Sequence, residues 1–292
     1  NRDFGIISNP EFLQESNAIR DTKYPHAIVL GGKQSKYMKK AKMFFSKMHP
    51  NVPIVITNFQ TAEMVKYANN SFLATKISFI NQLSNICQNI PGTNIDDVAK
   101  IIGLDPRIGK LFLNAGPGYG GSCLPKDISA LINFADKIGV NPLLLNAVKK
   151  TNHEQVNNIV SLMKKILGNI AAKRITVLGT AFKPNTDDIR DSKSIELIKK
   201  LLKNKAKITI HDPKAIENTK KIFGKKILYA KSISDALNKS QCVIIMTHWK
   251  QYDTLNNNSI KQMNRKIIID CRRVLVKKEL DAKYYAIGIG KN

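Results

Sequence analysis

The stretch Lys173-Arg174-Ile175-Thr176-Val177-Leu178-Gly179 indicates the fold class of this 292-residue chain. Its apolar and β-branched side chains, closed by a glycine, are typical of a strand that is buried on both faces. Comparable apolar runs follow at 206–212, 242–247 and 266–270, and residues with helical apolar spacing lie between them. Strands of this kind that alternate with helices predict a parallel sheet covered on both sides.

The carboxyl ends of these predicted strands are candidate ligand sites, because parallel α/β sheets bind their ligands there. Phe182-Lys183 follows the first strand, and Arg272-Arg273 follows the last. Gly179 stands alone rather than within a G-x-G-x-x-G pattern. We therefore expect this sheet to bind a ligand other than NAD.

Residues 1–58 predict a smaller α/β segment at the start of the chain. Short apolar runs at 5–8, 27–32 and 52–57 are typical of strands, and the spacing of apolar residues predicts a helix over 34–47. No G-x-G-x-x-G motif precedes these runs. The segment therefore resembles only the later part of a dinucleotide-binding fold.

Two pairs of polar residues at helical spacing are candidate functional groups. If residues 9–18 are helical, Glu11 and Glu15 share one face, although two acids at this spacing are as often a solvated surface. The next long helix carries Lys66 and Asn70 beside its apolar stripe. A cation and an amide donor on one side can stabilise a developing oxyanion, although such a pair alone is usually surface decoration.

The run Gly116-Pro117-Gly118-Tyr119-Gly120-Gly121-Ser122-Cys123-Leu124-Pro125-Lys126-Asp127 combines a glycine loop with a single thiol. Pro125 suits a first helical turn, so Cys123 immediately precedes a helix N-terminus, where free N–H groups favour a thiolate. Lys126 adds positive charge, and Asp127 is a candidate proton acceptor. A lone cysteine is most often inert and a glycine loop is most often a turn, but together they predict a nucleophile site.

Helical spacing also predicts a short helix near 95–102 and, after a break at 139–142, a long helix. Asn152 is a polar residue within the apolar stripe of that long helix. The stripe is compatible with a bridge between two domains or with burial against the equivalent helix of a partner.

Composition limits the classes of function. The formal net charge of +25 raises the possibility of nucleic-acid binding, but the lysines are spread along amphipathic helices without a nucleic-acid-binding motif. A solvated lysine-rich surface is the favoured explanation, and an anionic small substrate would benefit from the same field. The four cysteines and five histidines lack the spacing of a disulfide framework or a metal site. No apolar run is long enough to cross a membrane.

Five separated motifs resemble, in the same order, those of the nucleotide-sugar 6-dehydrogenases, the UDP-glucose/GDP-mannose dehydrogenase family. They are N-P-E-F-L at 9–13, E-M-V-K-Y-A-N-N-S-F-L-A at 63–74, G-P-G-Y-G-G-S-C-L-P-K-D at 116–127, G-T-A-F-K-P-N-T-D-D-I-R-D-S at 179–192 and D-C-R-R at 270–273. Cys271 departs from the usual glycine of the last motif. The resemblance covers essentially the whole chain.

This resemblance implies an NAD-dependent four-electron oxidation of the C6 alcohol of a nucleotide sugar. The glycine-loop motif is most like that of members that convert UDP-glucose to UDP-glucuronate, and GDP-mannose or another nucleotide sugar is the alternative. By resemblance, Cys123 forms a thiohemiacetal and then a thioester, and the other catalytic residues are Lys66, Asn70, Asp127, Glu11 and Glu15.

The resemblance also implies binding residues. The expected substrate contacts are Glu11, Phe12, Leu13, Lys66, Asn70, Arg107, Phe112, Asn114, Gly116, Gly118, Tyr119, Gly120, Phe182, Lys183 and Arg273. The expected NAD contacts are Glu15, Cys123, Lys126 and Arg190.

The expected fold is α/β with three parts. Residues 1–58 are the remnant of an N-terminal Rossmann-type NAD-binding domain, 59–170 a central helical dimerisation domain with a long linking helix, and 171–292 a C-terminal Rossmann-like domain for the UDP-sugar. We expect a cytoplasmic homodimer or higher homo-oligomer that binds neither nucleic acid nor membrane. Because the glycine fingerprint is missing, we expect this chain by itself to bind NAD poorly and to turn over slowly or not at all.

Two rival interpretations make different predictions. A basic nucleic-acid-binding protein would bind DNA or RNA with a steep salt dependence and would tolerate Cys123→Ser. A degenerate family member would bind nucleotide sugar without oxidising it, although the presence of Cys123, Lys66, Asn70 and Asp127 speaks against this.

Overall fold

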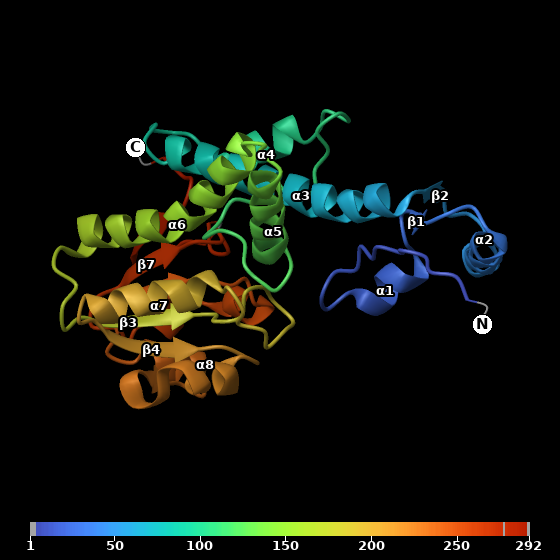
Figure 1. Ribbon diagram of the computed structural model, residues 1–292. Coiled ribbons are helices and arrows are strands. Elements are labelled where there is room, and N and C mark those ends of the chain that lie inside the picture. The colour runs from blue at the N-terminus through green and yellow to red at the C-terminus, as the bar shows by residue number, and fades with distance from the viewer. Residues whose placement is uncertain (1–3, 277, 291–292) are drawn as a thin grey trace. The chain divides into compact units, whose positions relative to one another are not determined.

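The computed structural model describes residues 4–276 and 278–290 and divides into two compact units, Asn1–Phe72 and Leu73–Asn292 (Figure 1). The boundary falls within the long helix α3 (Phe59–Cys87), which therefore contributes residues to both units. The division of the chain into three domains at 58 and 170 stays a prediction.

Unit 1 contains the predicted strand–helix–strand segment. Strands β1 (Ile28–Gly31) and β2 (Ile54–Thr57) pair in parallel, and α2 (Lys36–Met48) connects them. The side chain of Ser35 caps α2 by accepting a hydrogen bond of 3.3 Å from the Met38 amide. Met38 is buried with apolar residues of β1, so the helix is fixed to the sheet at its first turn.

The strand expected at 5–8 is wrong, because this run forms only an isolated bridge between Ser8 and Gly31. The condition for a shared helix face of Glu11 and Glu15 is not met, because α1 (Ala18–Lys23) begins only at the end of the segment 9–18. Glu11 and Glu15 therefore do not share a helix face. The reason is local, because the Glu11 carboxylate accepts a hydrogen bond of 2.7 Å from the Leu13 amide, which competes with a helical turn.

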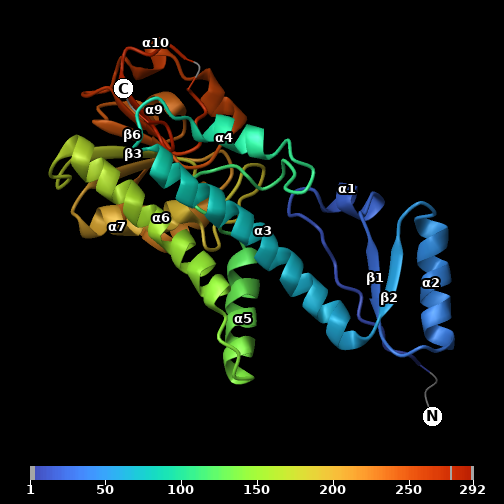
Figure 2. The same cartoon turned by 90° about the horizontal axis from the view of Figure 1, so that it is seen from above.

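The helical part of unit 2 consists of the second half of α3 and of α4 (Ile95–Ile102), α5 (Leu124–Lys137) and α6 (Leu143–Leu167). These match the predicted helices and the break before residue 143. Helices α5 and α6 contact each other, and Figure 2 shows them meeting at an angle. Their shared core with α3 consists of Ala74, Tyr119, Ile128, Ile132 and Val148.

The remainder of unit 2 is the predicted parallel sheet. Its order is β5-β4-β3-β6-β7-β8, and every adjacent pair is parallel. The strands are β3 (Arg174–Leu178), β4 (Lys207–His211), β5 (Leu228–Tyr229), β6 (Cys242–Ile245), β7 (Ile267–Asp270) and β8 (Lys283–Ala286). Sequence analysis missed β5, which is two residues long, and β8, whose K-Y-Y-A sequence lacks a continuous apolar run.

Helices cover both faces of the sheet, as the uninterrupted burial of β6 and β7 requires. Side chains of α6 and α7 (Lys193–Lys203) pack on one face, and those of α9 (Ile233–Leu237) and α10 (Asn257–Ile260) pack on the other. Figure 2 shows these pairs of helices on opposite sides of β3 and β6. The remaining elements are α8 (Ile216–Phe223) and the 3-10 helices η1 (Gly224–Lys226) and η2 (Lys250–Thr254).

The strand order places a change of winding direction between β3 and β6, where the chain moves to β4 on one side and to β7 on the other. In open α/β sheets, ligands bind outside the carboxyl ends of the strands at this point. None of the helices in the described residues is long and apolar enough to span a membrane. The same residues contain no group of three metal-ligating side chains.

Candidate active site

Two buried asparagines of unit 2 fix the start of the glycine loop. Asn81 accepts a hydrogen bond of 2.7 Å from the Gly116 amide. Asn152 accepts one of 2.8 Å from the Tyr119 amide and donates one of 3.0 Å to the Tyr119 carbonyl. The polar residue in the apolar stripe of α6 therefore acts on the glycine loop. Gly118 has φ +109°, and a Cβ there would lie 2.6 Å from the Asn152 Oδ1 atom, so a side chain at this position is excluded.

The second half of the loop approaches the segment that follows β3. A Cβ at Gly120 would lie 2.4 Å from the Asp191 carbonyl oxygen. The Gly121 amide donates a hydrogen bond of 2.9 Å to the Arg190 carbonyl. The glycines therefore allow two backbones, separated widely in sequence, to lie in direct contact.

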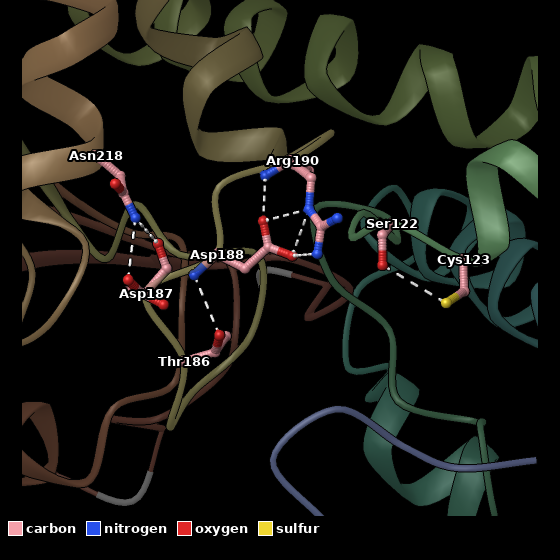
Figure 3. A network of polar contacts seen from close by, with 7 residues as sticks. All are labelled: Ser122, Cys123, Thr186, Asp187, Asp188, Arg190 and Asn218. Atoms are coloured by element: carbon pink, nitrogen blue, oxygen red, sulfur yellow. Dashed lines mark hydrogen bonds and ion pairs between the residues drawn. The ribbon is translucent and has the colours of Figure 1, made fainter. Parts of the chain in front are cut away.

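Cys123 stands at the end of this loop, directly before α5, and its side chain is exposed. Its Sγ atom lies 3.6 Å from the Ser122 Oγ atom (Figure 3). The first turn of α5 begins with a hydrogen bond of 2.9 Å from the Asp127 amide to the Cys123 carbonyl. Asp127 is buried, and its Oδ1 atom lies 3.2 Å from the Nζ atom of Lys126. The other three cysteines, Cys87, Cys242 and Cys271, are buried, which leaves Cys123 as the accessible thiol of the four.

Arg190 forms a two-point ion pair with Asp188 in the segment that contacts the glycine loop. Its Nε atom donates bonds of 3.0 and 2.9 Å, and its Nη2 atom donates one of 2.6 Å, all to the Asp188 carboxylate. The Asp188 amide donates a hydrogen bond to the Thr186 hydroxyl, and the Asn218 side chain donates one to the Asp187 carboxylate, as Figure 3 shows. The Arg190 side chain is largely exposed, so this pairing leaves one face open to solvent.

Three of the predicted residues meet within unit 1. The Nζ atom of Lys66 contacts the main-chain oxygen of Glu11, lies 3.2 Å from its Oε1 atom, and is 5.7 Å from the ring centroid of Phe12. Asn70 is buried one turn along α3, where it accepts a hydrogen bond of 3.3 Å from the Asn69 side chain. Glu15 and Leu13 lie in the irregular segment beside them in sequence.

A cavity of about 630 Å³ lies in unit 2 at the carboxyl ends of β3, β6 and β7. Residues after these strands form one wall, and α4 and the residues before the glycine loop form the other. The lining residues are Asp96, Ala99, Lys100, Leu104, Lys110, Leu113, Asn114, Ala115, Lys183, Pro184, His248, Arg272 and Arg273. Five of these are lysine or arginine and only Asp96 is acidic, so the cavity favours an anion.

The two arginines after β7 have different roles. Arg273 is buried, and it donates 2.7 Å to the Asp96 carboxylate and 2.8 Å to the Ala115 carbonyl, so it joins the sheet to the helical part. The Nε atom of Arg272 donates a hydrogen bond of 2.9 Å to the Met246 carbonyl. Its Nη atoms have no acceptor among residues 4–276 and 278–290. Burial lowers the pKa of Arg272 to about 10. Arg272 is therefore the better placed of the two for an anionic ligand.

The structure brings only part of the predicted set into this cavity. Asn114, Lys183 and Arg273 line it. Arg107 does not, because it is largely exposed and pairs with Asp105 at 2.6 Å. Phe112 precedes the lining residues with φ +64°, and Phe182 packs against Gly121.

Sequence analysis missed several lining residues. It named Arg272 only as a strand-end candidate, and it gave no role to Asp96, Lys100, Lys110 or His248. A motif could not have found them, because they come from α4, from the segment before the glycine loop and from the segment after β6, which only the folded chain brings together. The position of His248 in the segment that follows β6 was the one available signal.

A doubly wound parallel sheet with a cationic cavity at the carboxyl ends of its strands is typical of nucleotide-binding α/β proteins. Comparison with known proteins narrows this class. Residues 1–49, 60–154 and 176–277 match, respectively, the NAD-binding, central and UDP-binding domains of the UDP-glucose/GDP-mannose dehydrogenase family. The chain belongs to this family, which confirms the resemblance and the α/β fold predicted from the sequence.

Individual relatives agree with this assignment. The chain is 40% identical to the UDP-glucose 6-dehydrogenases of Rickettsia felis and Rickettsia conorii, over 98% of its own length and 65% and 67% of theirs. It superimposes on the UDP-glucose dehydrogenase of Pyrobaculum islandicum with a TM-score of 0.87 and 35% identity, over 97% of this chain and 63% of that one. The chain thus spans about two thirds of the length of these relatives.

Proposed function

We propose that this chain carries the substrate-binding and thiol-bearing parts of an NAD-dependent UDP-glucose 6-dehydrogenase. The observation that carries the proposal is the cationic cavity of about 630 Å³ at the carboxyl ends of the sheet. The match of residues 176–277 to a UDP-binding domain agrees with it. So do the relatives, which are named for UDP-glucose.

The cavity suits a nucleoside diphosphate. Lys183 and Arg272 approach it from the ends of β3 and β7, and Lys110 approaches from the side of the glycine loop. A guanidinium can bind two phosphate oxygens at once, and an ammonium acts as a point charge beside them. Leu104 and Leu113 provide apolar surface in the same cavity, which suits a base or a ribose.

In the proposed chemistry, the exposed Cys123 thiol holds the C6 carbon of the sugar. Once the alcohol has become an aldehyde, the sulfur adds to C6 and the carbonyl oxygen takes a proton, which forms a thiohemiacetal. Loss of a hydride and a proton converts this adduct into a thioester. Water then adds to the thioester carbonyl, the C–S bond breaks, and the carboxylate leaves as the thiol is restored.

Four polar side chains have proposed roles around this sulfur chemistry. Asp127, buried in the first turn of α5, accepts the proton of the attacking water at its carboxylate. Lys66 and Asn70 hold the C6 oxygen as negative charge develops on it. Glu11 assists thioester hydrolysis, and its contact with Lys66 supports a shared location for these two groups within unit 1.

NAD⁺ supplies the acceptor for the two hydrides when it is bound. Residues 1–49 match the family's NAD-binding domain, but the described residues of unit 1 hold β1, α2 and β2 without a G-x-G-x-x-G phosphate loop. Glu15, Cys123, Lys126 and Arg190 are the proposed cofactor contacts of this chain.

The remaining proposals concern the substrate contacts and the assembly. The other proposed substrate contacts are Phe12, Leu13, Arg107, Phe112, Asn114, Phe182, Lys183, Arg273 and the loop Gly116–Gly120. A cytoplasmic homodimer or higher homo-oligomer is proposed as well. Exposed apolar residues on the helices of unit 2, such as Phe79 and Ile86 of α3 and Phe134 of α5, support a second copy as partner.

A thermal-shift experiment on this chain tests the proposal. Saturation to about 100 Kd stabilises a protein by about 2.7 kcal/mol, so UDP-glucose should raise the melting temperature by about 5–10 °C. GDP-mannose and UDP-N-acetylmannosamine should give smaller shifts. Lys183→Ala should reduce the UDP-glucose shift, and Lys137→Ala, an exposed lysine at the end of α5, should not.

The outcomes separate the alternatives. If GDP-mannose alone raises the melting temperature, GDP-mannose replaces UDP-glucose as the proposed substrate. If no nucleotide sugar raises it, the proposed function is refuted. In the protein that contains all the family's domains, Cys123→Ser should abolish formation of the uronate. Full activity of that variant would refute the proposed covalent chemistry.

A further inference from the structure

The loop that follows β3 is held at successive peptide groups. The Thr180 carbonyl accepts a hydrogen bond of 2.7 Å from the Ser192 hydroxyl, and the Ala181 carbonyl accepts one of 2.7 Å from the Thr247 hydroxyl. The amides of Thr180 and Ala181 both donate to one oxygen of Asp212, at 2.7 and 3.0 Å. Lys183, which lines the cavity, follows two residues later.

Asp212 holds two further segments as well as this loop. Its Oδ1 atom accepts bonds of 2.9 and 2.8 Å from the amides of Lys214 and Ala215, which follow β4. Its Oδ2 atom accepts a third bond, of 3.2 Å, from the Trp249 indole after β6. One buried carboxylate, 3% exposed, thus receives five N–H groups from the segments that follow β3, β4 and β6.

These segments meet where the winding direction of the sheet changes. Two of them carry lining residues of the cavity, Lys183 after β3 and His248, which directly precedes Trp249. Asp212 itself does not line the cavity. The approach between the two segments is close, since a Cβ at Gly179 would lie 2.8 Å from the Thr247 amide nitrogen.

We propose that Asp212 is a positioning residue for the nucleotide site: it fixes the segments after β3 and β6, and through them Lys183 and His248 on the cavity wall. The inference rests on the proposed function, because the ligand is taken to be a nucleoside diphosphate. Asp212 does not touch that ligand. It fixes the loop that carries Lys183, and Lys183 is the cation that contacts the ligand.

The physical argument depends on the number of acceptor sites. A carboxylate offers two oxygens with about four lone-pair sites and no donor, which suits five converging N–H groups. In Asp212→Asn, one oxygen becomes an NH₂ group that faces N–H donors. Whichever oxygen this NH₂ replaces, it opposes N–H donors: those of Lys214 and Ala215 at Oδ1, or those of Thr180, Ala181 and Trp249 at Oδ2. The oxygen that remains carries no charge, so its hydrogen bonds to the other segments weaken as well. The segments then separate, and Lys183 leaves its position beside the phosphates.

Calorimetric titration with UDP tests the inference in this chain. Misplacing one phosphate-binding cation should weaken binding by about tenfold, equivalent to about 1.4 kcal/mol. We expect Asp212→Asn and Lys183→Ala each to weaken binding by about this factor. In the Lys183→Ala background, Asp212→Asn should add less than about threefold, because its main effect acts through Lys183.

Thr176→Val is the matched control for stability. Thr176 is buried in the same strand, β3, and its hydroxyl bonds to the Ala236 carbonyl at 2.5 Å and to the Ser240 hydroxyl at 3.1 Å, away from the cavity. The variant should lower the melting temperature and leave the affinity for UDP unchanged. If it weakens UDP binding as much as Asp212→Asn does, a general loss of stability explains the effect and the inference is wrong.

Trp249 provides a spectroscopic readout, because it is the one tryptophan of the chain. Its indole is 6% exposed and bonded to Asp212, so Asp212→Asn should shift its emission to longer wavelength while Thr176→Val should not. Unchanged emission, wild-type affinity of Asp212→Asn, or fully additive effects with Lys183→Ala would each overturn the inference. Failure of the unaltered chain to bind UDP would instead overturn the proposed function, and the inference with it.

Discussion

Replacing Asn152 with alanine should loosen the glycine loop that ends at Cys123. The Asn152 side chain forms two hydrogen bonds, of 2.8 and 3.0 Å, with the amide and carbonyl of Tyr119, and it is 6% exposed. A typical hydrogen bond contributes about 1 kcal/mol, and each buried backbone group left without a partner costs about 1–3 kcal/mol. The expected loss is about 3 kcal/mol in the free energy of unfolding of unit 2.

Urea denaturation followed by circular dichroism measures this loss, and amide hydrogen exchange localises it. The Tyr119 amide should exchange faster in Asn152→Ala, whereas amides in the centre of β3 should change only through the global loss of stability. In thermal unfolding, the same loss corresponds to a decrease of about 6–12 °C in the melting temperature.

Asn158→Ala is the matched control, since Asn158 is an exposed asparagine on the same helix. Its amide donates one bond, 3.4 Å to the Gln155 side chain, so its loss should change the free energy of unfolding by less than about 0.5 kcal/mol. A loss of less than about 0.5 kcal/mol for Asn152→Ala itself, or an equal loss for both variants, would refute the reasoning.

Two further predictions concern the sheet and the loop. Burial lowers the pKa of His211 below 6.5, and the charges of Asp212 and Asp235 offset part of this decrease. As the pH falls below 6.5, the unfolded state therefore binds more protons than the folded state, and the folded state loses stability. The melting temperature should therefore decrease between pH 7 and pH 5 by less in His211→Gln than in the wild type; equal slopes would contradict this. Gly120→Ala should destabilise unit 2 by about 1–3 kcal/mol, because the new Cβ would lie 2.4 Å from the Asp191 carbonyl oxygen. A wild-type urea midpoint for this variant would show that the two segments can separate freely.

The local elements were predictable from the sequence because each depends on neighbours along the chain. The apolar run at 174–178 forms β3, and the spacing of apolar residues in 95–102 forms α4. The helix face that Glu11 and Glu15 would share does not form, because the Glu11 side chain bonds to the backbone two residues later and opposes a helical turn. Such local side-chain bonds leave no periodic signal in the sequence.

The candidate site was predictable only where motifs carry it. The glycine loop and Lys183 follow from their own sequence contexts, and the structure places Lys183 on the cavity. Lys100, Lys110 and His248 have no such context, since they come from three separate elements that converge in the fold. The sequence also could not show which of Arg272 and Arg273 is better placed for an anionic ligand. That difference depends on the contact of Arg273 with Asp96 on α4.

The sequence by itself determined the fold class, the family and the candidate thiol, because periodicity, glycine and proline positions and motif spacing are properties of neighbouring residues. Only the tertiary structure decided which cations share one cavity, and that Asn152 and Asp212 act on loops far from them in sequence. The physical reason is that a buried polar group must find its partners wherever the packed chain brings them. Those partners are set by the fold of the whole unit, not by the local sequence.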